Sequence, residues 1–187
     1  MTYTVTTTTL PKFCEVIHGV LPPVVCEGLV DHFEQSDQQE RLDENGYPTF
    51  TQLIINQHLP DLVQPLVRYV VGAVDKYRQC NKVQTNYLPD VKALEELRIK
   101  RYNSDSEDRF DAHVDVTNCE TMKRYLALLF YLNDDFTGGE TSFIGYDSVK
   151  PKQGSVLVFP PTWQYPHAGL PVQTGTKYIM STYLHFI

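Results

Sequence analysis

The tripeptide His113-Val114-Asp115 is the part of the sequence best suited to metal chemistry. On an extended chain, side chains two positions apart point to the same side, so an imidazole and a carboxylate at this spacing can bind one cation. His32 and Glu34 have the same spacing, but they fall in a predicted helix, where residues two apart point about 200° from one another. His113 and Asp115 are therefore the first two candidate ligands.

A third candidate ligand and a basic residue follow later in the chain. His167 lies 52 residues after Asp115, and Lys177 lies ten residues after His167. Two histidines and one carboxylate occupy one face of an octahedral metal and leave three positions open, an arrangement typical of non-haem Fe(II) oxygenases. One carboxylate leaves Fe(II) with residual positive charge, which favours a dianionic co-substrate. Lys177 is then a candidate for binding that anion.

Further motifs surround these residues in a characteristic order. They are Arg101-Tyr102-Asn103, Tyr131-Leu132-Asn133-Asp134, Gly138-Gly139-Glu140-Thr141-Ser142-Phe143, Pro151-Lys152-Gln153-Gly154 and Gly175-Thr176-Lys177-Tyr178. In residue type, order and spacing, the region from Leu97 to Phe186 resembles the prolyl 4-hydroxylase branch of the 2-oxoglutarate- and Fe(II)-dependent dioxygenases. The resemblance covers roughly half of the chain.

The resemblance implies roles for the residues of the site. His113, Asp115 and His167 would bind Fe(II) and form the catalytic centre, and Lys177 would bind the distal carboxylate of 2-oxoglutarate. The further candidates for binding this co-substrate are Tyr102, Tyr131, Thr141 and Ser181. Tyrosine is also common in strands, so a structural role for the two tyrosines stays open.

Other residues near the motifs are candidates for shaping the pocket and for contacting the substrate. Many relatives carry tryptophan where this chain has Tyr183, so the floor of the pocket is expected to differ. Trp163 and Tyr165, just before His167, are candidate substrate-binding residues, with packing as the alternative. The acidic residues between positions 105 and 111 are either a solvated loop or an acidic lip of the cleft.

The resemblance also implies the reaction. Fe(II) would be the cofactor and 2-oxoglutarate and O₂ the co-substrates, with ascorbate as a further candidate. 2-Oxoglutarate would be converted to succinate and CO₂ while a substrate C–H bond is hydroxylated, and peptidyl proline is the expected target. Hydroxylation of a free amino acid or other small molecule stays open, because a fold does not determine its substrate. A non-catalytic jelly-roll binding module is the alternative from another class.

The second half of the chain is predicted to supply the strands. Period-two runs separated by turn residues occur at Leu97–Tyr102, Tyr125–Leu132, Thr141–Ile144, Ser155–Phe159 and Lys177–Phe186. In the last run, Lys177, Ile179, Ser181, Tyr183 and His185 share one face, which is the polar one. We expect this face to look into the site and the other face to pack in a core layer.

The first half is predicted to contain two helices. One begins at Pro22-Pro23, and the other runs from Pro60-Asp61 to about Cys80, each with proline at its start. A short strand-like run, Thr49–Ile55, lies between them. Helices followed by strands favour an α+β, mainly β class: a jelly roll with the helices packed on one sheet, which the resemblance specifies as a double-stranded β-helix. We expect one domain over 1–187, with a helical support region at 1–90 and a catalytic core at 91–187.

Composition excludes several functions. The 187 residues include 16 Lys and Arg against 23 Asp and Glu, a net charge of −7, which argues against binding nucleic acid or anionic lipid with the whole surface. The sequence shows neither a secretory signal pattern nor a long apolar run, so we expect a cytoplasmic protein without a membrane partner. Four widely spaced cysteines predict reduced thiols. The expected partner is a peptide or protein substrate.

Overall fold

The computed structural model describes residues 9–43, 48–83, 87–106 and 108–187. Its elements, in chain order, are β1 (Glu15–Ile17), α1 (Pro23–Gln35), β2 (Glu40–Asp43), β3 (Thr49–Ile54), α2 (Ile55–His58), α3 (Pro60–Asn81), β4 (Arg98–Asn103), β5 (Phe110–His113), β6 (Arg124–Tyr131), β7 (Thr137–Gly138), β8 (Thr141–Phe143), β9 (Val156–Phe159), β10 (His167–Gly169), β11 (Val172–Thr174) and β12 (Thr176–His185). The described chain is therefore mainly β, as predicted.

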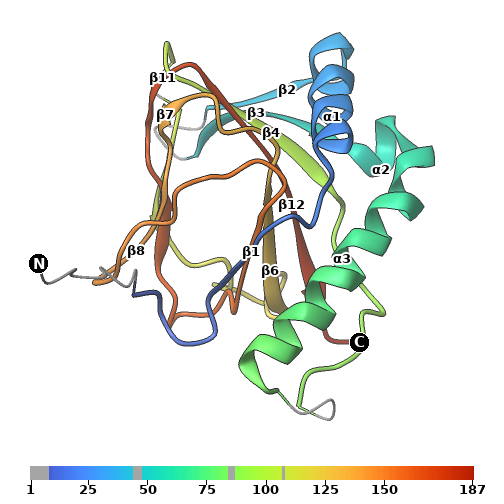
Figure 1. The fold of residues 1–187 in the computed structure, drawn as a ribbon, viewed down its shortest axis with the longest axis vertical. Helices are drawn as coiled ribbons and strands as arrows, with labels where there is room; N and C mark the ends of the chain where they lie inside the picture. The colour runs from blue at the N-terminus through green and yellow to red at the C-terminus, as the bar shows by residue number, and fades with distance from the viewer. Residues whose placement is uncertain (1–8, 44–47, 84–86, 107) are drawn as a thin grey trace, which may run out of the picture.

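A seven-stranded antiparallel sheet forms the centre of the molecule. Its strand order is β1-β9-β6-β12-β4-β3-β2, and two smaller antiparallel sheets have the orders β5-β10-β8 and β11-β7. Figure 1 shows the three helices on one side of the larger sheet, while β7, β8 and β11 lie on the opposite side. The larger sheet thus separates the helices from the small sheets.

The five strands predicted in the second half are observed as β4, β6, β8, β9 and β12, with ends that differ by at most one residue. The first half departs from a purely helical support region, because β1, β2 and β3 join the larger sheet. β5 and β10, which carry the two histidines of the site, are only four and three residues long. Runs this short carry too little period-two signal to be recognised from sequence.

Both long helices begin with proline. The first backbone N–H groups of a helix have no partner within the helix, so proline, which lacks this group, costs no hydrogen bond there. α3 extends one residue beyond the predicted end, and Lys82 stops it by adopting a left-handed conformation with φ of 51°. In α1 the buried side chains are Cys26, Leu29 and Phe33, and Val25 beside them is half-buried. No described helix is long and apolar enough to cross a membrane.

Period-two packing divides the core between the two faces of the larger sheet. The helix-side core joins the helices to one face of the central strands and includes Phe33, Val70, Leu126, Leu128, Phe130, Val156, Val158, Met180 and Leu184. The site-side core lies under the small sheets and includes Phe50, Tyr102, Ala127, Tyr131, Phe143, Leu157, Phe159 and Ile179. The alternation along β12 confirms the predicted division of its faces.

Candidate active site

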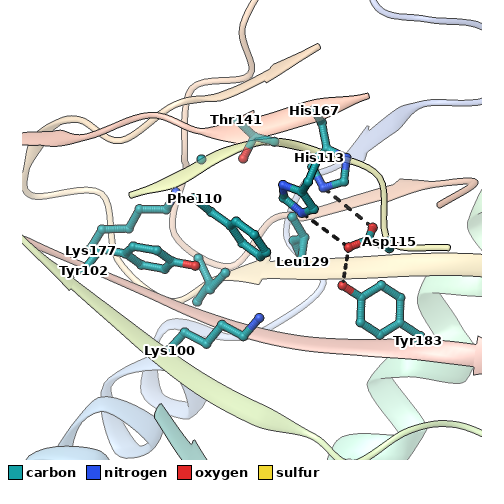
Figure 2. Close-up of a pocket in the computed structure, with 12 residues that line it drawn as sticks. Lys100, Tyr102, Phe110, His113, Asp115, Leu129, Thr141, His167, Lys177 and Tyr183 are labelled. Carbon is teal, nitrogen blue, oxygen red and sulfur yellow. Dashed lines mark hydrogen bonds and ion pairs between the residues drawn. The ribbon is translucent and has the colours of Figure 1, made fainter. Parts of the chain in front are cut away.

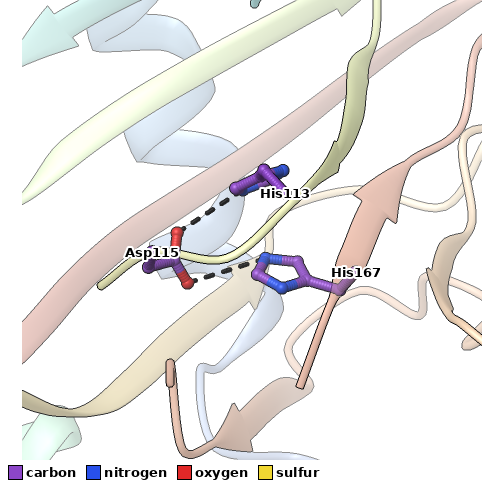
Figure 3. A group of neighbouring side chains, drawn as sticks. All are labelled: His113, Asp115 and His167. Carbon is purple, nitrogen blue, oxygen red and sulfur yellow. Dashed lines mark ion pairs between the residues drawn. The ribbon is translucent and has the colours of Figure 1, made fainter. Parts of the chain in front are cut away.

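His113, Asp115 and His167 come together on the site side of the larger sheet. His113 ends β5 and is the register partner of His167, the first residue of β10, while Asp115 follows β5 by two residues. One ligand atom from each residue lies within 4.8 Å of the others. Figure 3 shows the carboxylate facing both rings. Its Oδ1 lies 3.4 Å from His113 Nε2, and its Oδ2 lies 3.6 Å from His167 Nε2.

Backbone carbonyls orient both imidazole rings. His113 Nδ1 lies 2.7 Å from the Asp111 carbonyl oxygen, and His167 Nδ1 lies 3.1 Å from that of Tyr165. A ring nitrogen facing a carbonyl carries the proton, which leaves each Nε2 with a free lone pair toward Asp115. Phe110 stacks on the His113 ring at a centroid distance of 3.6 Å, which holds that ring in place.

Asp115 is 7% exposed and is anchored by its surroundings. Its backbone N–H donates to the Pro161 carbonyl, and the Tyr183 hydroxyl donates to Oδ1 at 2.7 Å. Burial favours the neutral acid, yet the contacts with His113, His167 and Tyr183 together hold the pKa of Asp115 below its ordinary value. Burial also lowers the pKa of His167, against the opposing charge of Asp115. An ionised carboxylate and a neutral imidazole are the forms that bind a metal.

The donor set fits Fe(II). Oδ2 of Asp115 is buried and has no hydrogen-bond partner among the described residues, which would be costly unless a cation satisfied it. Two imidazole nitrogens and one carboxylate oxygen form the set typical of non-haem Fe(II) with open coordination positions. His113, Asp115 and His167 would therefore hold the metal.

A charged network lies behind Asp115. The Arg124 guanidinium donates to the Asp115 carbonyl at 2.9 Å and lies 4.1 Å from the centre of the Tyr183 ring. Glu95 accepts from Arg124 Nε and Nη2, and His185 Nε2 lies 2.8 Å from the same carboxylate. This network could not be predicted from the sequence, because its members are far apart in the chain. The only signal was the place of Tyr183 and His185 on the polar face of their strand.

Lys177 lies in the same pocket as the candidate metal ligands (Figure 2). It is buried, its Nζ donates to the Gly139 carbonyl at 2.6 Å, and it lies 5.2 Å from the centre of the Tyr102 ring. Tyr102 is its register partner on β4, so both side chains enter the pocket at the same level. Burial lowers the pKa of Lys177 to about 8, with the charge of Glu140 opposing the shift. This end of the pocket therefore offers a cation and a hydroxyl to an anion.

The other predicted co-substrate residues lie near Lys177 but differ in access. Thr141 lines the pocket, and its hydroxyl is 2.9 Å from that of Tyr131. Tyr131 is completely buried behind it, and its ring centre lies 5.9 Å from Lys177 Nζ. Ser181 is buried on the same strand face and does not line the pocket. Burial raises the pKa values of Tyr102 and Tyr131, which keeps both hydroxyls protonated and able to donate.

The structure does not bring the predicted substrate residues into the pocket. Trp163 is 76% exposed on the loop before β10. Tyr165 is half-buried against the site-side core and contacts His167 through its carbonyl oxygen. Neither side chain lines the pocket, so a substrate role for them stays a prediction.

Both alternatives for the acidic stretch, a solvated loop and an acidic lip, are wrong for Asp108. This residue is 0% exposed, forms an ion pair of 2.7 Å with Arg41 and accepts a hydrogen bond from the Asn103 backbone. Asp111 pairs with Arg109, and Glu107 lies outside the described residues. Asp108 therefore stabilises the loop instead of facing the cleft.

Comparisons with known proteins agree with this site. A family model described as "2OG-Fe(II) oxygenase superfamily" matches residues 97–185. The "Putative prolyl 4-hydroxylase" of Acanthamoeba polyphaga mimivirus is 41% identical over 66 residues, which span 30% of this chain and 27% of that protein. The matched part is thus a small share of that relative's length.

Solved structures show the same fold. A viral collagen prolyl hydroxylase from Paramecium Bursaria Chlorella virus-1, in complex with 2OG, has a TM-score of 0.67 at 21% identity, covering 94% of this chain and 97% of that one. A Pseudomonas putida prolyl-4-hydroxylase has a TM-score of 0.72 at 17% identity and covers 94% of each chain. A Trichoplax adhaerens prolyl hydroxylase in complex with a hypoxia inducible factor peptide has a TM-score of 0.68 at 16% identity, covering 93% and 84%. Residues 97–185 therefore match the 2OG-Fe(II) oxygenase superfamily by sequence, and the described chain has the fold of the solved prolyl hydroxylases.

Proposed function

We propose that the protein is an Fe(II)- and 2-oxoglutarate-dependent dioxygenase that hydroxylates a peptidyl proline. The observation that carries this proposal is one pocket with two ends: His113, Asp115 and His167 at the first, and Lys177 with Tyr102 at the second. The names of the relatives support proline as the target, and the Trichoplax structure, which holds a peptide, supports a peptide substrate.

We also propose that the larger sheet and the two small sheets together form a double-stranded β-helix, or jelly roll. The position of the small sheets opposite the helices supports this assignment (Figure 1). Strands from both halves of the chain share the larger sheet, which supports a single catalytic domain over 1–187.

Each end of the pocket would have its own task in catalysis. When bound, Fe(II) and 2-oxoglutarate would supply the oxidative chemistry, which yields succinate, CO₂ and a hydroxylated product. His113, Asp115 and His167 would hold the cation with two nitrogen donors and one oxygen donor, and the lowered pKa values of Asp115 and His167 favour the forms that bind a metal. Lys177, which donates to the Gly139 carbonyl, would bind the distal carboxylate of the co-substrate through a charge-assisted hydrogen bond.

The remaining wall of the pocket positions the ligands and limits water. Thr141 and Tyr102 offer hydroxyl groups beside Lys177. Leu129 and Ile179 line the pocket between its two ends and present apolar surface to the bound co-substrate. In a mostly apolar pocket, the few polar groups fix the orientation of a small ligand.

The direct test is product formation by the purified protein. The protein is reconstituted with Fe(II) and 2-oxoglutarate in air, and succinate and a mass increase of one oxygen atom are measured on proline-containing peptides and on free proline. Succinate and a hydroxylated peptide are expected, and Asp115→Ala provides the inactive control. Product from free proline alone would instead establish the small-molecule alternative. Absence of metal-dependent 2-oxoglutarate binding would contradict the proposed function and favour a non-catalytic binding module.

A further inference from the structure

Lys100 is a second lysine in the candidate active site, and the proposed chemistry gives it no task. It lies two residues before Tyr102 on β4, so both side chains project from the same face of the sheet. Figure 2 shows the Lys100 side chain reaching toward the floor of the pocket between Tyr102 and Tyr183.

The strand register places Lys100 nearer the metal ligands than Lys177. Tyr102 is paired with Lys177, whereas Lys100 is paired with Ile179, two positions further along β12 toward Tyr183. Tyr183 in turn donates its hydroxyl hydrogen bond to Asp115. Lys100 is therefore located beside the middle of the pocket, between its cationic end and its metal-binding end.

The Lys100 ammonium is not matched by an anion. Within the described part of the chain, no hydrogen bond or ion pair reaches its Nζ, which lies 4.8 Å from the centre of the Phe50 ring. Lys177, by contrast, donates to a carbonyl oxygen. Burial lowers the pKa of Lys100 to about 8, although the charge of Asp115 opposes the shift. A half-buried cation without a partner is unfavourable, and a bound anion would compensate it.

The charges of the loaded site indicate where this anion must come from, an argument that rests on the proposed function. Fe(II) and Lys177 together carry three positive charges, and Asp115 with doubly ionised 2-oxoglutarate carries three negative charges. These groups balance one another without Lys100. Its charge is then left for a group that neither the protein nor the co-substrate supplies.

We propose that Lys100 binds a carboxylate of the substrate, close to the C–H bond that is hydroxylated. The carboxylate can come from a free amino acid or a peptide C-terminus, or from an acidic side chain next to the target proline. All three share one chemistry, a single carboxylate within reach of Lys100. Lys100 is thereby a specificity-determining residue of the pocket.

The test compares binding of matched probes that differ in one carboxylate. The protein is loaded with Mn(II) and 2-oxoglutarate without O₂, so that no turnover occurs, and affinities are measured by calorimetry. The pairs are proline and prolinamide, a proline-terminated peptide as acid and as amide, and an internal-proline peptide with Asp or Asn after the proline. A charge-assisted hydrogen bond predicts that the acid in at least one pair binds roughly 10- to 150-fold more tightly.

Variants assign this preference to Lys100. Lys100→Met should weaken binding of the acid probe alone, so that the acid and the neutral probe bind with nearly equal affinity. Lys100→Arg should retain part of the preference for the acid. Lys100→Gln, which remains polar, serves if the Met variant does not fold. Lys76→Met removes the same charge from an exposed position on α3 and should preserve the wild-type ratio.

Three results would overturn the proposal: no acid preference in the wild type for any pair, a preference that persists in Lys100→Met, or a loss of 2-oxoglutarate affinity in Lys100→Met as large as that in Lys177→Met. The last result would assign Lys100 to the co-substrate. Failure of the wild type to bind 2-oxoglutarate with Mn(II) would instead count against the proposed function, and the acid preference is then measured without co-substrate. The pair that shows the preference identifies the source of the carboxylate.

Discussion

The two faces of the larger sheet are built from the same strands but have opposite chemistry. On β12, Met180 and Leu184 point into the helix-side core, whereas Lys177, Ile179 and Tyr183 line the pocket. The helix-side core contains apolar side chains packed against three helices. The pocket face buries a lysine, a carboxylate and an imidazole, of which the carboxylate has an unpaired oxygen.

This difference separates stability from function within one strand. Burial of apolar area stabilises a fold, whereas burial of polar groups that await a ligand destabilises the unliganded state. The helix-side core therefore offsets the unfavourable pocket face. Substitutions in the helix-side core should therefore change stability, and substitutions on the pocket face should change ligand binding.

The largest effect is expected from loss of a metal ligand on the pocket face. Asp115→Ala should abolish metal-dependent turnover, because it removes the one anionic donor of the site. The far-UV circular dichroism spectrum should stay unchanged, since the side chain packs little apolar surface. Metal affinity measured by calorimetry provides the check, and a variant that kept full affinity would show that the ligand assignment is wrong.

The matching substitution on the other face should act on stability instead. Phe130→Ala removes a completely buried ring from the helix-side core and should lower the free energy of unfolding by about 3–5 kcal/mol. Urea denaturation measures this change. The folded fraction should bind metal and 2-oxoglutarate as the wild type does. A loss of ligand affinity in folded protein would show that the two faces are coupled.

Lys177→Ala should weaken 2-oxoglutarate binding roughly 10- to 150-fold, because a charge-assisted hydrogen bond contributes about 1.5–3 kcal/mol. Metal affinity should change little, since Lys177 lies at the other end of the pocket. Lys177→Arg should recover part of the loss, and Lys76→Ala is the control for charge. An unchanged dissociation constant in the alanine variant would remove Lys177 from the co-substrate site.

Tyr183→Phe should weaken metal binding roughly 10-fold, because it deletes the hydrogen bond to Asp115 Oδ1 that orients this carboxylate. The affinity for 2-oxoglutarate at saturating metal should stay the same, which separates positioning of Asp115 from binding of the co-substrate. Thermal unfolding serves as the stability control. Equal metal affinity in both proteins would mean that Arg124 and the backbone position Asp115 without the hydroxyl.

The last prediction concerns pH. Burial lowers the pKa of Lys177 to about 8, so its cation is present below that pH and is lost above it. The affinity for 2-oxoglutarate should therefore be constant below pH 8 and fall by at most about tenfold per pH unit above it. Calorimetry from pH 6.5 to about 9.5 measures the profile, with Lys177→Met as the variant in which the fall should disappear. A fall that persists in this variant would assign the titration to another group.

The sequence alone determined the local features of this protein. The prolines at the helix starts and the alternation along β6, β9 and β12 are local signals, because dihedral restriction and side-chain direction act between neighbours in the chain. The spacing of His113 and Asp115 is of the same kind. These signals were sufficient to predict the main elements and the candidate ligands.

Tertiary structure alone decided which distant side chains meet. The strand register brings Lys100 into the pocket with Lys177, and the fold aims the Tyr183 hydroxyl at Asp115. It also buries Asp108 against Arg41, where the sequence had predicted either a solvated loop or an acidic lip. Such pairs are separated by tens of residues, and their contacts depend on sheet register and side-chain packing, which no local pattern encodes.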